Sequence, residues 1–194
     1  RAPEALYDLE SDPDETRNLA TDPAYREITS RLRLRLADWE RSMPDLGFYP
    51  EPVLVHEAAA APLAFGQAHR KDLARLADIA DLALQPIAVA SPKIDQALTS
   101  SSPWERYWGL IVCSALGQAA GGFRDQAKAL AARDPERLVR VRAAEFLGLI
   151  HAADPVPALR AALRESPDIA ETILILNTVT LLRDHHGYEI TITQ

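Results

Sequence analysis

The chain has little of several residue types on which common protein functions depend. Its single cysteine, Cys113, excludes an internal disulfide and any metal site built from several cysteines. Lys and Arg number 21 against 28 Asp and Glu, which gives a net charge of −7. Nucleic acid is therefore not an expected partner, because affinity for phosphates depends on clustered basic residues. No apolar run reaches the ~18 residues that cross a bilayer, so we expect no membrane-spanning segment.

What is present is the composition of an ordinary globular protein, with 47% apolar and 25% charged residues. A length of 194 residues suffices for one substantial core or two small ones. The densest basic group is Arg31, Arg33 and Arg35, with Asp38 and Glu40 close behind. This mixture of charges favours a solvated helix face over a binding patch.

Three helix starts recur at a spacing of 32 residues: Ser102-Pro103, Asp134-Pro135 and Ser166-Pro167. In each pair the first residue is a good N-cap, and proline fits the first helical position because no N–H is missed there. Ser102 with Glu105 also fits a capping box. Apolar residues at helical spacing follow each pair, so the sequence predicts three regularly spaced helices.

A partner helix is predicted before each of these three, at residues 92–98, 123–132 and 157–163, and a further amphipathic helix at 72–84. A helix pair every ~32 residues, each unable to bury its stripe alone, indicates an all-α fold of the α-solenoid type. The stretch DPERLVRVRAAEFLG, from Asp134 to Gly148, resembles a HEAT repeat. We expect three HEAT-like pairs, the last acting as a cap, with an extended tail from Tyr188 to Thr193.

The first 68 residues follow a different pattern. Ala5 to Leu9 is predicted to form a short strand, and Asp22-Pro23 opens a helix that ends near Met43-Pro44. Its apolar stripe consists of Tyr25, Ile28, Leu32, Leu36 and Trp39. Residues 44–68 are rich in proline and are expected to be an extended connector. The expected organisation is thus residues 1–43, a connector at 44–68, and a helical repeat domain at 69–194.

The opening stretch EALYDLESDPDETRNLA, from Glu4 to Ala20, resembles the C-terminal region of the sulfatase family, in the alkaline-phosphatase-like superfamily. Members often carry Glu-Leu-Tyr-Asp-Leu, then Asp-Pro-x-Glu and Asn-Leu, followed by a helix. The resemblance covers about 43 residues and places the short strand and the helix in a sulfatase C-terminal subdomain. Bacterial members also carry helical repeats behind the sulfatase domain, and residues 73–84 and 106–110 are similar to such tails.

The resemblance implies that a parent enzyme hydrolyses sulfate esters with a formylglycine made from Cys or Ser in a Cys/Ser-x-Pro-x-Arg motif. A calcium ion held by Asp and Asn would lie beside it. This chain lacks the motif: Ser114, Ala115 and Leu116 follow Cys113, and the stretch from Ser101 has Glu105 where the arginine belongs. No active-site residue is therefore assigned, and no cofactor is expected within this chain.

Several other patterns have a structural interpretation that outweighs the functional one. His56-Glu57 begins like a zinc-protease helix, but Ala60 stands where the second histidine is needed. Asp8, Glu10, Asp12 and Asp14 alternate like calcium-loop ligands, yet Pro13 and Leu19 occupy the positions that require glycine and glutamate. Turn capping and solvated charge explain these acidic residues better.

The remaining candidates are a cysteine, a histidine pair and two tryptophans. Cys113 has no basic neighbour in sequence and is interpreted as a small core residue, and His185-His186 suits the C-terminal end of a helix. Trp104 and Trp108 lie four residues apart and are expected to pack into the core. The alternative is an interaction surface, since aromatic faces at the end of a helical stack can hold sugars or partner side chains.

The leading hypothesis is the C-terminal, non-catalytic part of a sulfatase, in which the helical repeats serve interaction or substrate presentation. Its expected partners are an upstream sulfatase catalytic domain and a protein or sulfated glycan, and its location would be periplasmic or secreted. The rival hypotheses are a protein-binding HEAT-like scaffold unrelated to catalysis, and a fragment with no function of its own.

Overall fold

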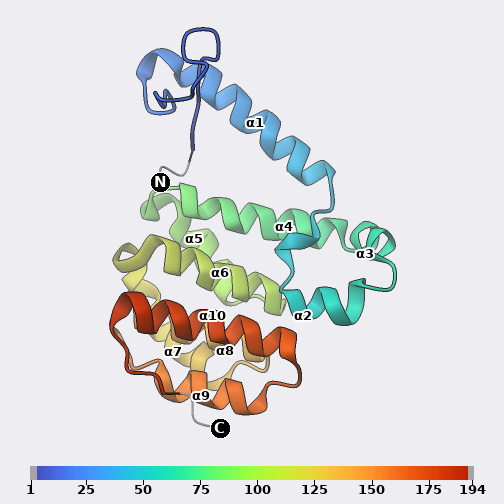
Figure 1. Cartoon of the computed structure of the whole chain (residues 1–194), viewed down its shortest axis with the longest axis vertical. Coiled ribbons are helices and arrows are strands. Elements are labelled where there is room, and N and C mark those ends of the chain that lie inside the picture. The colour runs from blue at the N-terminus through green and yellow to red at the C-terminus, as the bar shows by residue number, and fades with distance from the viewer. Residues whose placement is uncertain (1–3, 192–194) are drawn as a thin grey trace. The chain divides into compact units, whose positions relative to one another are not determined.

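The computed structural model describes residues 4–191 and divides the chain into two compact units, residues 1–44 and 45–194 (Figure 1). We call these the N-terminal unit and the C-terminal unit and describe each by itself. Helices make up the regular structure between residues 4 and 191, which confirms the all-α expectation. Within the same range, no helix combines the length and hydrophobicity needed to cross a bilayer.

The N-terminal unit contains a 3-10 helix, Pro23–Tyr25, and the long helix α1, Arg26–Ser42. The carboxylate of Asp22 accepts the backbone N–H of Ala24 and so caps the start of this helical stretch, as the Asp-Pro pair predicts. The preceding segment is tied to α1 through Glu4, whose carboxylate binds the guanidinium of Arg33 in a bidentate pair.

The strand predicted at residues 5–9 is absent, and residues 4–191 contain no strand at all. Its backbone bonds go elsewhere: the side-chain oxygen of Asn18 accepts the N–H of Leu6 at 3.0 Å. The Asn18 amide donates to the carbonyl of Glu4, and the N–H of Leu19 donates to the carbonyl of Leu6. A strand needs a neighbouring strand to satisfy its backbone, and here a folded-back loop takes that place.

The C-terminal unit is a succession of helices. It begins with a 3-10 turn at Leu46–Phe48, followed by α2 (Glu51–Val53), a π-helical turn (Leu54–Ala58), α3 (Pro62–Ala68), α4 (Arg70–Ala80) and a 3-10 turn at Asp81–Leu84. The chain continues through α5 (Ile87–Leu98), α6 (Pro103–Leu116), a 3-10 stretch (Gly117–Phe123), α7 (Arg124–Arg133), α8 (Arg137–Leu149), α9 (Val156–Glu165) and α10 (Ile169–His186).

The expected extended connector at 44–68 is instead largely helical and belongs to the C-terminal unit from Asp45 onward. Its prolines do not prevent helix formation because Pro52 and Pro62 stand in the first turns of α2 and α3, where no N–H is needed. Tyr49 and Val53 are buried and form a small core with Leu73 and Leu76 of α4. This segment therefore packs onto the stack.

The helices pack in a regular order. Helix α4 packs on α6, α6 on α8, and α8 on α10, while α5 packs on α6, α7 on α8, and α9 on both α8 and α10 (Figure 1). Two glycines permit close approach: a Cβ on Gly109 would lie 3.1 Å from Ala97, and one on Gly148 would lie 3.0 Å from Pro155. The main core is buried between these layers, around Leu110, Val139 and Phe146.

The predicted helix boundaries shift where side chains find better partners. Ser102 precedes α6 but makes no capping bond, and Glu105, the expected capping-box partner, pairs with Arg75. The residues that cap α8 and α10 are Glu136 and Asp168 rather than Asp134 and Ser166. The Asp134 carboxylate binds Arg106 and accepts the backbone N–H of Glu136, before the helix begins at Arg137.

Two further elements differ from expectation. Helix α5 begins at Ile87, five residues before the predicted start, and contains Pro92 in its interior. Burial of Ala90, Ile94 and Leu98 offsets the backbone bond that this proline removes. Gly187 ends α10 with a φ of 72°, and residues 188–191 form no helix or strand. The rest of the expected extended tail lies outside the described residues.

A buried ion pair joins two successive helix pairs. The Nε of Arg106, in α6, lies 2.7 Å from Oδ2 of Asp134, and its Nη2 lies 2.9 Å from Oδ1. The exposed fractions of the two side chains are 11% and 2%. The guanidinium also donates to the carbonyls of Ser100 and Ser101, so the loops before α6 and α8 are held by one side chain.

Replacing Arg106 with methionine should lower the free energy of unfolding by about 3–5 kcal/mol, because the Asp134 carboxylate would stay buried without a counter-ion. Urea denaturation followed by circular dichroism measures this. Arg183→Met is the matched control, since it removes an exposed pair with Asp184 and should leave the unfolding midpoint unchanged. Equal shifts in the two variants would contradict a special role for the buried pair.

Candidate interaction surface

Trp104 and Trp108 lie in the first two turns of α6, and both are partly buried against the core of the C-terminal unit. The indole N–H of Trp108 donates to the backbone carbonyl of Phe48 at 2.7 Å. The ring of Phe48 lies 5.4 Å from that of Trp108, centroid to centroid. Trp108 therefore holds the start of residues 44–68, the segment predicted to be a connector.

Trp104 belongs to a chain of aromatic rings. Its ring forms edge-to-face pairs with Tyr49, at a centroid distance of 6.3 Å, and with Tyr107, at 6.2 Å. Tyr49 continues to Phe65 and His69, and burial raises the pKa of its phenol to about 12. Edge-to-face contacts of this kind add to the stabilisation from buried area. The rings thus fasten residues 45–69 to α6.

The tryptophans are partly buried and pack against the core, in the direction that the first interpretation predicts. Phe48, Tyr49 and Tyr107 contact the two indoles, so part of each indole is already used within the unit. An interaction surface at Trp104 and Trp108 stays a prediction. The aromatic partners at 48 and 49 were missed because they lie about 55 to 60 residues away in sequence.

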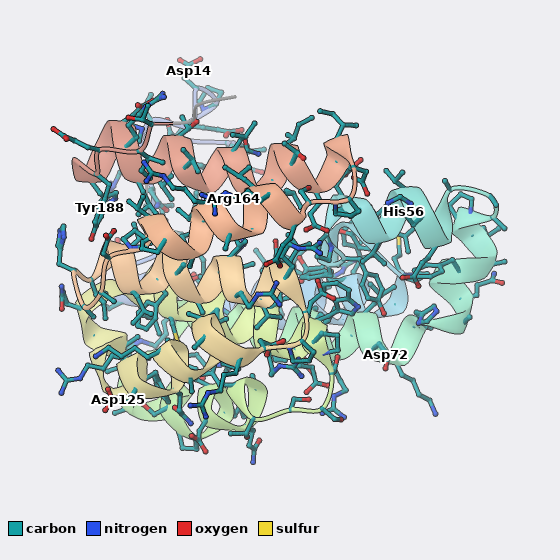
Figure 2. The ribbon with its side chains drawn as sticks, turned by 90° about the horizontal axis from the view of Figure 1, so that it is seen from below. Asp14, His56, Asp72, Asp125, Arg164 and Tyr188 are labelled. Carbon is teal, nitrogen blue, oxygen red and sulfur yellow. The ribbon has the colours of Figure 1, made fainter. Side chains whose placement is uncertain are left out.

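His56 makes a contact that no sequence pattern indicates. Its Nε2 lies 2.6 Å from Oδ2 of Asp168, 112 residues later in the chain, while Oδ1 of Asp168 accepts the backbone N–H of Glu171. The backbone N–H of Glu171 and the hydrogen bond to His56 hold the pKa of Asp168 below its usual range. Figure 2 shows His56 at the same end of the C-terminal unit as Asp72, away from Asp125 and Tyr188.

The other groups with chemical potential are used in local structure. Asp12 accepts hydrogen bonds from Thr16 and the backbone of Arg17, which lowers its pKa, and Asp8 accepts from Glu10 and Ser11. Turn capping is thus their role here. Cys113 is fully buried, and burial raises the pKa of its thiol to about 12, in agreement with a core residue. Residues 4–191 contain no cluster of three potential metal ligands.

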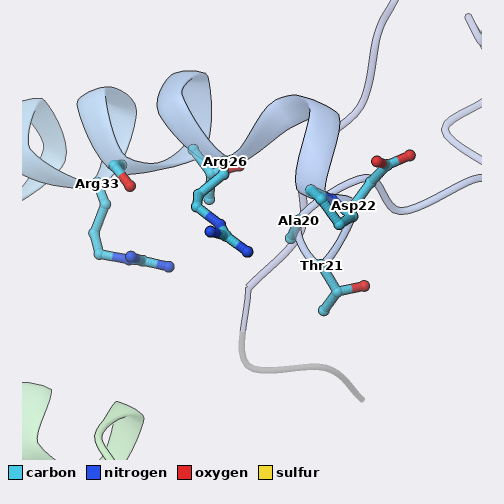
Figure 3. Close-up of a pocket in the computed structure, with 8 residues that line it drawn as sticks. Ala20, Thr21, Asp22, Arg26 and Arg33 are labelled. Carbon is cyan, nitrogen blue, oxygen red and sulfur yellow. The ribbon is translucent and has the colours of Figure 1, made fainter.

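Each unit has a hollow among the residues that the structure describes. In the N-terminal unit, a cavity of about 90 Å³ lies beside the start of α1, lined by Thr21, Asp22, Arg26 and Arg33 among others (Figure 3). In the C-terminal unit, an apolar groove of about 230 Å³ runs between α7, α8 and α9, lined mainly by alanines and prolines. Neither contains an arrangement of acid, base and nucleophile.

Comparison with known proteins gives one informative match. A stretch of 40 residues is 50% identical to human N-sulphoglucosamine sulphohydrolase and covers 21% of this chain and 8% of that protein. The chain therefore spans less than a tenth of the length of this curated relative. No protein-family model and no solved structure matches the chain. The match agrees with the resemblance to sulfatases.

Replacing Trp108 with phenylalanine should lower the free energy of unfolding of the C-terminal unit by about 1–3 kcal/mol, because the carbonyl of Phe48 loses its donor. Urea denaturation measures the loss, and limited proteolysis should cleave residues 45–68 faster. Trp39→Phe is the control, since Trp39 is 56% exposed in α1. If both variants unfold alike, the indole bond does not hold the segment.

The ionised form of Asp168 should stabilise the fold at neutral pH. Because its folded-state pKa is lowered, that contribution is present above the unfolded pKa of ~3.9 and is lost as pH falls through the folded pKa. Asp168→Asn should therefore melt below the wild type at pH 7, and the difference should shrink as the pH falls below ~3.9 and through the folded-state pKa. His56→Ala should show a smaller loss at pH 7, since the bond from Glu171 remains. A difference that grows as the pH falls would refute this assignment.

Proposed function

We propose that this chain is the C-terminal, non-catalytic part of a sulfatase-related hydrolase, in which residues 1–43 belong to the sulfatase-like domain and the C-terminal unit is an accessory module. The observation that carries the proposal is the 40-residue match, at 50% identity, to a human sulphohydrolase. The resemblance of residues 4–20 to the C-terminal segment of the sulfatase family also supports the proposal. The two together favour a sulfatase over an unrelated scaffold.

The proposal assigns the chemistry to another part of the parent protein. The chain has no Cys/Ser-x-Pro-x-Arg motif, and its one cysteine lies buried in α6 with a raised thiol pKa. A thiol in that state is neither accessible nor ionised at neutral pH. Formylglycine and calcium, if the parent uses them as the family does, would both be held outside this chain.

The C-terminal unit is proposed to be a short HEAT-like solenoid of three helix pairs, α5–α6, α7–α8 and α9–α10. Support comes from the 32-residue spacing of the helix starts and from the order in which α6, α8 and α10 pack on one another. Such stacks present extended surfaces to partners. The module would serve assembly or the presentation of a protein or a sulfated glycan, in a periplasmic or secreted enzyme.

The gene sequence upstream of Arg1 provides the most direct test. A Cys/Ser-x-Pro-x-Arg motif with acidic metal ligands within several hundred residues is the expected result. An unrelated domain in that position would refute the sulfatase assignment and favour the scaffold hypothesis.

Deleting residues 45–194 from the parent protein should spare the turnover of a small aryl sulfate, because the chemistry lies elsewhere. The cut is placed before Asp45 because residues 45–68 belong to the C-terminal unit and pack with the stack. Assembly, or activity on a sulfated polysaccharide, should change instead, as light scattering and a polysaccharide assay would detect. Loss of small-substrate turnover in a truncated protein that remains folded would mean that the stack helps to build the active site.

A further inference from the structure

Residues 46–58 form a strap that bridges the two ends of the helical row α4, α6, α8 and α10. At its start, the carbonyl of Phe48 accepts the indole N–H of Trp108 in α6, and Tyr49 and Val53 are buried in a core shared with α4. Further along, α2 packs on α10. The strap therefore contacts both the first and the last helix of the row.

The far end of the strap is the π-helical turn Leu54–Ala58. The flanking residues Val53 and Ala58 are buried, whereas Val55, His56 and Glu57 are exposed. The bond from Nε2 of His56 to Oδ2 of Asp168, 2.6 Å long, ties this exposed turn to the start of α10. Single π-helical turns are rare and recur at functional sites.

The surroundings of His56 are negatively charged. The charged side chains on the elements packed against its turn are acidic: Asp168 and Glu171 at the start of α10, Glu51 of α2 and Glu57 of the turn itself. Helix α3 contributes no charged residue. Glu171 is already paired with Arg137 of α8 at 2.6 Å, so Asp168 is the carboxylate that His56 meets directly. The His56 side chain is 56% exposed, and its ring can therefore exchange a proton with solvent.

We propose that the bond between His56 and Asp168 is a proton-dependent latch, which holds the strap on α10 when the imidazole is protonated and loosens when it is neutral. A hydrogen bond between two charged groups is stronger than one from a neutral donor, and imidazole changes its charge between about pH 5 and pH 8. Asp168 stays ionised over that range, because hydrogen bonds from Glu171 and His56 hold its pKa below the usual range. The closed latch is therefore favoured at acidic pH and weakens as the pH rises.

The latch gives the C-terminal unit a surface that differs between acidic and neutral surroundings. When it loosens, the seam between the strap and the start of α10 becomes accessible, while Tyr49 and Val53 keep the first part of the strap in place. The inference concerns the C-terminal unit alone and does not rest on its assignment to a sulfatase.

Amide hydrogen exchange of the 194-residue chain, followed by mass spectrometry at about pH 5.5 and about pH 8, measures the opening of residues 51–58. His56→Gln is the reference at each pH, because the glutamine amide keeps a neutral donor near the position of Nε2. Relative to this variant, the wild type should exchange about two- to fivefold more slowly at the lower pH and equally fast at the higher pH. His185→Gln, exposed in the last turn of the same helix, is the matched control and should behave as the wild type.

A second pair of variants identifies the partner of the imidazole. Asp168→Asn keeps an N-cap for α10, since Asn caps as well as Asp. In this background His56→Gln should change the exchange of residues 51–58 at neither pH. A ratio of wild type to His56→Gln that is the same at both pH values, or that changes in the opposite sense, overturns the proposal. Loss of the pH effect in His185→Gln, or an equal change in the exchange of α8, overturns it as well.

Discussion

The buried pair between Arg106 and Asp134 is the contact on which the arrangement of the C-terminal unit depends. Removing either partner would destabilise the fold, because the remaining charge would be buried without a counter-ion. Arg106 is fixed by two carboxylate oxygens and two carbonyls, which sets where the loop before α8 lies relative to the start of α6. Apolar packing alone would tolerate a sliding of these helices, whereas a bidentate pair does not.

Further polar contacts continue this pattern across the stack. Arg142 of α8 donates to Glu145 and to the hydroxyl of Tyr107, in α6, and its guanidinium lies over the Tyr107 ring. Glu145 in turn accepts the hydroxyl of Thr178, in α10, at 2.6 Å. The helices α6, α8 and α10 are thereby joined by a hydrogen-bond network that includes the buried carboxylate of Glu145. A network in which every member has a partner specifies a single packing arrangement more strictly than an apolar core of equal volume.

The sequence predicts most helices of the C-terminal unit because their signals are local. An Asp-Pro or Ser-Pro pair and a leucine stripe need only a few neighbouring residues to be interpreted. The predictions fail where a residue distant in sequence determines the local structure. Asp134 binds Arg106 and is not the N-cap of α8. Phe48 and Tyr49 contact the tryptophans of α6. Prolines at 52 and 62 predict an extended chain, but in the fold they occupy helix starts. The pair His56 and Asp168, 112 residues apart, has no local signal at all.

The two units differ in how they satisfy their apolar residues, and this difference bears on function more than any single side chain does. In the C-terminal unit the groups that could perform chemistry are used structurally: the Cys113 thiol is buried, and His56 is bound to an N-cap carboxylate. Such a unit offers shape and surface to a partner. In the N-terminal unit, by contrast, α1 leaves its leucines and Trp39 exposed to water, which is unfavourable for apolar side chains. The second unit therefore buries its apolar residues within itself, whereas the first unit does not.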